Sequence, residues 1–396
     1  MSTHRAAKNI LIVGAGIAGL ALARQLQKMN IPFTLVEKRS VLGADGTGIA
    51  LPANAVRALR YLGLGDEIDR QAHRVKEIIY TKPSGKVLSK ASLLVPPLNI
   101  DNFVAMTRGQ CHELMRAGLE EMIHLNTTVE SLTLQKENVL VKFNGLNLPE
   151  SEYSAVIGAD GLHSQIKRLA FGNYPLVDLN VTNWRWICDY PTDYLQPTYM
   201  IGAQDIIMAY PIARDLVYCY AHIYDPKKQY TKRDDHRSNL KKIFGNYRGI
   251  ATEMLTYLPD NPEILPGRLC SVSKVLFCQG HIGLIGDASS ACSPMLQQGA
   301  ASALEDAIVL SELLAEFSSE RALILYKKYR HDRVNWIVQA SDGPMKKIIK
   351  MNSSLALFMR NLLIEYKGPL NVQGWRKLLM EDPIDQLPKF IAAHRH

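Results

Sequence analysis

The chain has 396 residues, 47% of them hydrophobic, which is enough for two lobes and a sizeable core. Its 46 basic and 38 acidic side chains give a net charge of +8, but no basic face with interleaved aromatic residues and no known module indicates a nucleic-acid partner. Six scattered cysteines without a C-x-x-C spacing predict no metal site and fit a reducing cytoplasm, and no apolar run is long enough for an integral membrane segment.

The first unit of the chain, residues 9–37, is predicted to be strand, glycine turn, helix and strand. The apolar run Ile10–Val13 is typical of a buried parallel strand, and Phe33–Val36 is the expected second strand. A helix is expected between them, over about residues 17–29. Its N-terminal N–H groups and its dipole would favour a bound phosphate.

The turn of this unit has the spacing G-x-G-x-x-G at Gly14, Gly16 and Gly19. The first glycine allows a sharp turn, the second lets backbone approach a pyrophosphate, and the third permits close packing of helix on strand. Glu37 ends the second strand 23 residues after Gly14, where a carboxylate can accept hydrogen bonds from ribose hydroxyls. These features together predict a bound dinucleotide, and a glycine-rich structural turn is the alternative.

The next elements alternate between this fold and a second lobe. After a loop, a helix is expected at about residues 54–62. Residues 75–89 predict a hairpin turned at a Pro-Ser-Gly sequence, and we assign it to the second lobe because it interrupts the nucleotide fold. A short strand at 104–106 precedes a helix over about 108–121, with Thr107 as its expected N-cap.

A second buried strand with a polar end follows further along the chain. Residues 127–134 and 138–143 predict another hairpin, and the apolar run 155–159 predicts a buried strand. Asp160 comes directly after it, at the strand edge where ligands bind in parallel sheets, and a helix ending near Arg168 is expected next.

Residues 176–266 differ in character, because short segments rich in Trp and Tyr alternate there. Tyr218, Tyr220 and His222 share one face of a strand by their period of two. We therefore expect an antiparallel sheet with one covered face, which serves as the substrate lobe, and a helix at about 234–247 on its far side.

The third informative segment begins with an expected buried strand at 280–285 and continues with Gly286 and Asp287. After Pro294, the residues from 296 onward are predicted to enter a long helix that ends near Phe317. A second helix, at 320–341, and an apolar helix at 345–366 are expected to follow. We expect this last helix to pack on the protein, with a membrane anchor as the alternative.

The segments 9–37, 155–168 and 275–307 together resemble the class A flavoprotein monooxygenases of the para-hydroxybenzoate hydroxylase type, over about residues 9–336. The resemblance implies FAD in the first fold, with NADPH or NADH as a transient electron donor. It also implies the reaction, in which O₂ adds to reduced flavin at C4a and the hydroperoxide hydroxylates an aromatic or polycyclic small molecule.

This resemblance implies specific contacts with FAD. Asp287 would accept from ribityl hydroxyls, and a helix starting near Gln298 would direct N–H groups at the flavin pyrimidine. An ordinary surface role is the alternative for Arg39 and Arg108. The full set of expected cofactor residues is Gly14, Gly16, Ala18, Gly19, Glu37, Lys38, Arg39, Gly48, Arg108, Asp160, Gly286, Asp287, Pro294, Gln298, Gly299 and Ala300.

The third segment departs from the family pattern at Ser289, Ser290, Gln297 and Ala301, which stand where Ala, His, Gly and Asn are usual. If the backbone at Gln297 needs a positive φ, a non-glycine residue costs roughly 1 kcal/mol. We expect FAD binding to be retained despite these four changes. Because of them, the family resemblance says less about the substrate and the reactivity.

No general base can be assigned from the sequence. Tyr210, Tyr220 and His222 are candidate catalytic residues of the substrate pocket, and the alternative for each is a packed aromatic side chain. No metal is expected to take part. Another flavin oxidoreductase, such as a halogenase or a prenyl-chain reductase, and a flavin-binding protein without turnover are the competing functions.

The predicted fold class is α/β, with a Rossmann-like FAD-binding domain, a smaller substrate domain built on a mostly antiparallel sheet, and C-terminal helices. The protein is expected to be a cytoplasmic monomer or homodimer. The expected boundaries are 1–74, 101–175 and 267–343 for the FAD-binding domain, 75–100 and 176–266 for the substrate domain, and 344–396 for the C-terminal helical segment.

Overall fold

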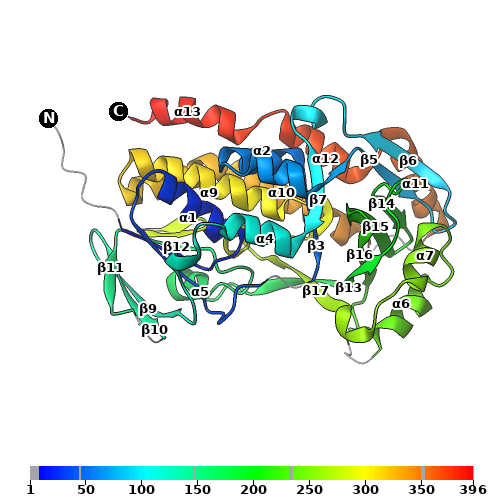
Figure 1. Ribbon diagram of the computed structural model, residues 1–396, viewed down its shortest axis with the longest axis horizontal. Helices are drawn as coiled ribbons and strands as arrows, with labels where there is room; N and C mark the ends of the chain where they lie inside the picture. The colour runs from blue at the N-terminus through cyan, green and yellow to red at the C-terminus, as the bar shows by residue number, and fades with distance from the viewer. Residues whose placement is uncertain (1–8, 44–45, 146–147, 232–234, 349–352, 396) are drawn as a thin grey trace.

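Two large sheets organise the protein, one at each end of an elongated molecule (Figure 1). The α/β fold class expected from the sequence is confirmed. The computed structural model describes residues 9–43, 46–145, 148–231, 235–348 and 353–395.

The first sheet is mostly parallel and is centred on β1 (Ile10–Val13). All four residues of β1 are buried, because both faces of the sheet are covered, and this explains the unbroken apolar run. Helices cover one face, and the small sheet over residues 128–153, with the helix at 165–171, covers the other. Only β18 runs antiparallel, at one edge. The strand order is β18 (Cys278–Gln279), β19 (Ile282–Leu284), β12 (Ala155–Gly158), β1, β2 (Phe33–Val36) and β8 (Ile123–His124).

Long helices form the core against this sheet. The helix α1 (Ile17–Lys28) packs along α9 (Gly299–Glu316), which also contacts α2 (Ala53–Tyr61) and α10 (Ser319–Ile348). The predicted helices at 17–29, 54–62 and 296–317 are thereby confirmed within a few residues.

Two predicted helix boundaries are wrong. The helix expected over 108–121 ends earlier, as α4 (Arg108–Arg116), because the chain turns at Gly118 with a φ of +80°. The helix expected over 345–366 is two pieces: α10 continues through Pro344 to residue 348, and α11 (Ser354–Lys367) follows. Buried Met345 packs on β13 (Leu176–Asp189), which favours continuation of α10 past the proline. Residues 349–352 lie outside the described part of the chain.

The second sheet has seven strands and is antiparallel except where β14 runs parallel to β5. Residues of opposite parity along its strands form two separate cores, one under α6 (His236–Phe244) and α7 (Ile250–Thr256) and one facing the rest of the molecule. The order is β17 (Leu265–Val272), β13 (Leu176–Asp189), β16 (Leu216–Tyr224), β15 (Asp205–Ala213), β14 (Thr198–Ile201), β5 (Glu77–Thr81) and β6 (Val87–Ser92).

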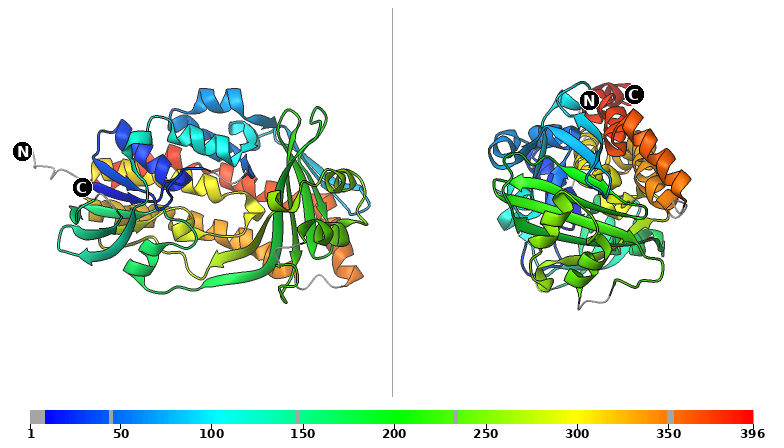
Figure 2. Two further views of the ribbon diagram at one scale, coloured as in Figure 1. Left: turned by 60° about the horizontal axis from the view of Figure 1, so that its bottom comes forward. Right: turned by 90° about the vertical axis from the view of Figure 1, so that its right-hand side faces the viewer.

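The hairpin expected over 75–89 is β5 and β6, and it completes the far edge of this sheet. The helix expected at 234–247 is α6, although residue 234 itself lies outside the described residues. Figure 2 shows β13 and β17 running from the seven-stranded sheet toward the parallel sheet. Two further three-stranded sheets have the order β11 (Ser151–Tyr153), β10 (Val139–Asn144), β9 (Thr128–Leu134) and β3 (Gly48–Leu51), β7 (Phe103–Thr107), β4 (His73–Val75).

The C-terminal residues return across the molecule as α11, α12 (Leu370–Leu379) and α13 (Pro383–Ala393). Trp375 is buried on α12, and its indole N–H donates to the carbonyl of Leu296 at 2.8 Å. The α13 helix packs on α9. In the described ranges, no helix is both long and apolar enough to cross a membrane.

Candidate functional site

The glycine turn after β1 has the geometry expected of a phosphate-binding turn. Gly14 has a φ of +106°, and a Cβ there would lie 2.6 Å from the carbonyl oxygen of Ala159. A Cβ on Gly19 would lie 1.9 Å from the carbonyl oxygen of Gly14, so α1 packs on the turn only with glycine at this position. Gly16 has open space where a side chain would be. The turn therefore leaves room for a ligand only beside Gly16.

Glu37 is held at the end of β2 by two backbone amides. Its Oε2 accepts from the N–H of Ala15 at 2.9 Å, and its Oε1 accepts from the N–H of Arg39 at 3.0 Å. Each carboxylate oxygen keeps a second lone pair, so both can still accept from ribose hydroxyls. The exposed guanidinium of Arg39 donates to the carbonyl of Gly43 at 3.1 Å and follows its own loop.

An open cleft lies at the carboxyl ends of β1, β2 and β12. It is bordered by the glycine turn, the loop after β2, the first turn of α4 and the loop after β12. Such a position is where dinucleotides bind in parallel α/β sheets. The cleft brings together the predicted residues Gly14, Gly16, Glu37, Lys38, Arg39, Arg108 and Asp160.

His112 also lines this cleft and was not predicted. Its Nε2 lies 2.8 Å from the carbonyl oxygen of Ala15, so this nitrogen carries the proton. The sequence could have indicated His112 by its position four residues after Arg108, because that spacing places both side chains on one face of α4. Thr107 caps this helix, as predicted, in a capping box with Gln110.

The carboxylate of Asp160 accepts hydrogen bonds from residues that follow it closely in the sequence, and these contacts were not predicted. Its carboxylate accepts from the hydroxyl of Ser164 at 2.5 Å and from the backbone amides of Gln165 and Ile166 at 2.7 and 3.1 Å. Asp160 thus stabilises the start of α5 (Gln165–Phe171) while it borders the cleft. Its contact with FAD stays a prediction.

Three of the expected cofactor residues lie where elements pack closely. A Cβ on Gly48 would lie 2.4 Å from the ring of Tyr218, so β3 touches the seven-stranded sheet here. A Cβ on Gly286, whose φ is +58°, would meet the Cβ atoms of Ala18 and Ala303 at 3.0 and 3.2 Å. These positions let backbone segments around the expected flavin approach one another.

Asp287 stands at the first position of α8 (Asp287–Ser290) and has accessible surface, although protein surrounds it on several sides. Desolvation by these neighbours raises the pKa of Asp287, and the positive charge of Arg108 offsets part of that rise. Within the described residues no donor satisfies its carboxylate. An accessible carboxylate that no described donor occupies is free to accept from a ligand that offers hydroxyl groups.

The start of α9 is fixed by a pair of side-chain amides. Asn54 Nδ2 donates to Gln298 Oε1 at 2.9 Å, and Gln298 Nε2 donates back to Asn54 Oδ1 at 3.3 Å. Gly299 and Ala300 form the first turn, whose N–H groups have no partner inside the helix. The helix start can therefore stabilise negative charge on a neighbouring ring.

The backbone just before this helix adopts the positive φ that was considered for Gln297 in the sequence analysis. Gln297 has φ +52° and ψ 32°, in the left-handed region. Its Nε2 donates to the hydroxyl of Tyr199 at 2.7 Å, a contact that a glycine cannot make. Pro294 is exposed two positions before buried Leu296.

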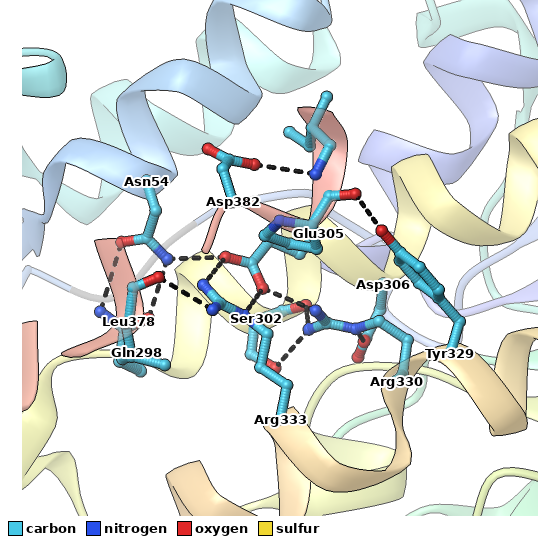
Figure 3. A network of polar contacts seen from close by, with 12 residues as sticks. Asn54, Gln298, Ser302, Glu305, Asp306, Tyr329, Arg330, Arg333, Leu378 and Asp382 are labelled. Carbon is cyan, nitrogen blue, oxygen red and sulfur yellow. Dashed lines mark hydrogen bonds and ion pairs between the residues drawn. The ribbon is translucent and has the colours of Figure 1, made fainter. Parts of the chain in front are cut away.

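A buried ionic network lies behind the α9 terminus (Figure 3). The guanidinium of Arg330 contacts Glu305 and Asp306, each at 2.7 Å, and all three side chains are almost fully buried. Arg333 makes two hydrogen bonds to Glu305, which also accepts from Asn54 at 2.8 Å. Burial alone would raise the pKa of Glu305, but the two arginines outweigh it and lower that pKa to about 2.

The three candidate catalytic residues are on the inner face of the seven-stranded sheet, and none of them lines the cleft described above. The hydroxyl of Tyr220 lies 3.1 Å from Nδ1 of His222. Burial lowers the pKa of His222 to about 4, so the imidazole is neutral at pH 7. Tyr210 is buried edge-on to Tyr199, and its hydroxyl has no partner among the described residues.

Arg185 was overlooked by the sequence reasoning. It lies directly opposite Tyr220 across β13 and β16, and Asn183 lies opposite His222. Its Nε is buried without a partner, and no described carboxylate forms an ion pair with it. The period of two, which puts Trp184 and Trp186 in the opposite core, would have placed Arg185 on this inner face.

In the residues that the structure describes, no group of three or more His, Cys, Asp or Glu side chains is placed to hold a metal ion. Three features fit FAD. They are the parallel sheet with its glycine turn, the Asp287 carboxylate without a described donor, and the N–H groups at the start of α9 that have no partner inside the helix. Fold and site together define an FAD-binding flavoprotein.

The chain belongs to the family described as FAD binding domain, whose model matches residues 7–342. It is 28% identical over 365 residues to 2-heptyl-3-hydroxy-4(1H)-quinolone synthase of Pseudomonas aeruginosa, covering 90% of this chain and 93% of that protein. It is 24% identical over 339 residues to aurachin C monooxygenase/isomerase of Stigmatella aurantiaca, covering 84% and 87%.

Solved structures show the same fold. Klebsiella pneumoniae HpxO, complexed with FAD and uric acid, has a TM-score of 0.78 and 20% identity, covering 97% of this chain and 96% of that one. P. aeruginosa PqsL, in complex with 2-aminobenzoylacetate, has a TM-score of 0.76 and 17% identity, covering 91% and 99%.

Proposed function

We propose that this protein hydroxylates an aromatic or polycyclic small molecule with O₂, taking electrons from NADPH or NADH. The observation that carries the proposal is the position of two buried nitrogen atoms without a described partner, Nε of Arg185 and Nε2 of His222, on the inner face of an aromatic sheet. That sheet touches the FAD-binding part of the chain where Gly48 meets Tyr218. Polar groups left unpaired at such a junction favour a bound polar ligand.

The residues that would hold FAD divide by the part of the cofactor they suit. The N–H groups beside Gly16 suit the pyrophosphate, Glu37 suits a ribose, and Asp287 suits the ribityl hydroxyls. The start of α9 at Gly299 suits the flavin pyrimidine. Bound FAD would supply the redox chemistry, accepting a hydride from the nicotinamide and activating O₂.

The side chains of the sheet would orient the substrate and hold its charge. Arg185 is a cation without a counter-ion among the described side chains, so it suits an ionised hydroxyl, carbonyl or carboxylate of an aromatic ring. Ionisation of a ring hydroxyl makes the ring carbons richer in electrons. Neutral His222 contacts the hydroxyl of Tyr220 through Nδ1, and its Nε2 stays available for proton transfer with the ring hydroxyl of the substrate.

The domain boundaries, localisation, oligomeric state and partners expected from the sequence are also part of this proposal. The FAD-binding domain comprises 1–74, 101–175 and 267–343, the substrate domain 75–100 and 176–266, and the C-terminal helical segment 344–396. The protein is a cytoplasmic monomer or homodimer and has no nucleic-acid partner. The quinolone and aurachin activities named for the two relatives make 2-alkyl-4(1H)-quinolones the first substrates to test.

The test is a turnover assay with the FAD-loaded protein. Phenols, 2-alkylquinolones and tetracycline-like polycycles are supplied with NADPH or NADH, and nucleotide oxidation, H₂O₂ and product mass are measured together. We expect one substrate class to accelerate nucleotide oxidation and to gain one oxygen atom. Chlorinated or reduced products would indicate a halogenase or a reductase instead, and a protein that binds FAD without any turnover would overturn the enzyme proposal.

A further inference from the structure

The helix α11 presents an apolar face to solvent. Six large side chains share this face, because their spacing of three and four residues places them along one side of the helix. We call them the α11 stripe. Their exposed fractions are Leu355 69%, Phe358 62%, Met359 54%, Leu362 47%, Leu363 45% and Tyr366 86%.

The opposite face fixes the helix on the protein. The guanidinium of Arg360 donates to the carbonyls of Gly202 and Ile201, at 2.5 and 3.4 Å, in the turn between β14 and β15. Ile364 is buried in the core beneath the seven-stranded sheet. These contacts hold α11 in one orientation, with the α11 stripe turned to solvent. The helix itself lies at the edge of the molecule (Figure 2).

The surroundings of the α11 stripe are basic. Lys346 and Lys347 are exposed in the last turn of α10, and Lys367 is exposed in the last turn of α11. The sequence of α11 contains one acid, Glu365, which pairs with Lys82 at 3.6 Å. The whole chain carries a net charge of +8. An exposed apolar stripe with basic residues at its ends suits an anionic partner surface.

We infer that the α11 stripe docks the protein on an anionic lipid bilayer, with α11 lying flat in the interface. Its 14 residues give a length of about 21 Å, which is too short to span a hydrocarbon core of about 30 Å. A flat position buries the apolar side chains and leaves the lysines at the lipid headgroups. A second copy of the chain is a poorer occupant, because symmetric contact would bring the basic ends of two stripes together.

This inference goes beyond the proposed reaction and does not depend on it. It gives the enzyme a place where amphiphilic aromatic compounds concentrate, since such compounds partition into membranes. The helix α11 contacts α12 and β6, and β6 belongs to the seven-stranded sheet that carries Arg185 and His222.

The experiment is vesicle flotation of the full-length, FAD-loaded protein. Vesicles of phosphatidylethanolamine with phosphatidylglycerol are compared with vesicles of phosphatidylcholine, at low and high salt. The test variant is Phe358→Asp with Leu362→Asp. The matched control is Ile324→Asp, which places the same charge on an equally exposed apolar residue, 56% exposed, near the start of α10.

We expect the wild-type protein and the Ile324→Asp variant to float with the anionic vesicles and to be partly released by salt. The double variant should lose at least about tenfold in partitioning, with an unchanged melting temperature and FAD absorbance. Failure of the wild-type protein to float would overturn the inference, as would undiminished flotation of the double variant. A dimer in light scattering that only the double variant loses, without vesicle binding, would assign the stripe to a second copy and also overturn it.

Discussion

The carboxylate of Asp306 accepts a hydrogen bond from the backbone N–H of Gly286 at 3.1 Å. The other oxygen of the same carboxylate accepts from Nε of Arg330 at 2.7 Å. The buried ionic network therefore supports the turn that presents Asp287 to the expected flavin. Removal of a charge from this network should affect both the stability of the fold and the cofactor site.

Replacement of Arg330 should be strongly destabilising. Arg330→Met leaves the carboxylates of Glu305 and Asp306 buried with less compensation, which costs about 3–5 kcal/mol. Urea denaturation of the cofactor-free protein measures this difference. The matched control is Lys142→Met, which breaks the exposed pair with Glu130 and should cost less than about 1 kcal/mol. Equal effects of the two variants would contradict a supporting role for the network.

Local patterns predicted much of the fold and of the cofactor site. The glycine spacing and the apolar runs concern neighbours along the chain, so β1, α1, β2 and the acid at Glu37 followed directly. The network around Arg330 did not, because its partners on α9 and α2 meet only through packing. The end of α10 was mispredicted for the same reason, since Met345 packs on residues far away in the sequence.

The substrate face shows a different limit. Tyr218, Tyr220 and His222 were correctly placed on one face, because alternation along a strand is local. The same alternation would place Arg185 on the inner face, but its position opposite Tyr220 depends on strand register, which a single sequence does not determine.

Removal of the Asp287 carboxylate should weaken FAD binding. Asp287→Ala deletes an acceptor that no described donor satisfies, so an effect on the order of 1–3 kcal/mol is expected in the free energy of FAD binding. Asp287→Asn keeps one acceptor oxygen and should lose less. Fluorescence quenching during FAD titration gives the dissociation constants, and the unfolding of the cofactor-free proteins serves as the control. Unchanged FAD affinity in Asp287→Ala would show that this residue only starts α8.

The buried imidazole of His222 should make stability depend on pH. Its pKa falls to about 4 in the folded protein because of burial, while an unfolded histidine titrates near 6.5. The unfolded state therefore binds more protons below pH 6.5, and this contribution to stability is complete above that value and lost as the pH falls toward 4. Between pH 7 and pH 5 the loss is about 2 kcal/mol.

The comparison that isolates this effect uses His222→Gln. Denaturation curves at several pH values should be flatter for the variant by that amount, because other titrating groups cancel in the difference. Parallel pH profiles for the two proteins would mean that His222 takes up its proton equally in the folded and unfolded states.

Arg185 should set the affinity for an ionised substrate. Arg185→Met keeps much of the side-chain length but removes the cation opposite Tyr220, so an anionic aromatic substrate loses a charge-assisted hydrogen bond. Such a bond contributes about 1.5–3 kcal/mol, which corresponds to a rise of roughly ten- to hundredfold in the dissociation constant. Arg185→Lys keeps the charge and should lose less. FAD content should not change, because Arg185 does not line the nucleotide cleft. The discriminating measurement repeats the titration with an O-methylated analogue that cannot ionise. A purely structural role would weaken both ligands equally, whereas a role in holding negative charge weakens only the ionisable one.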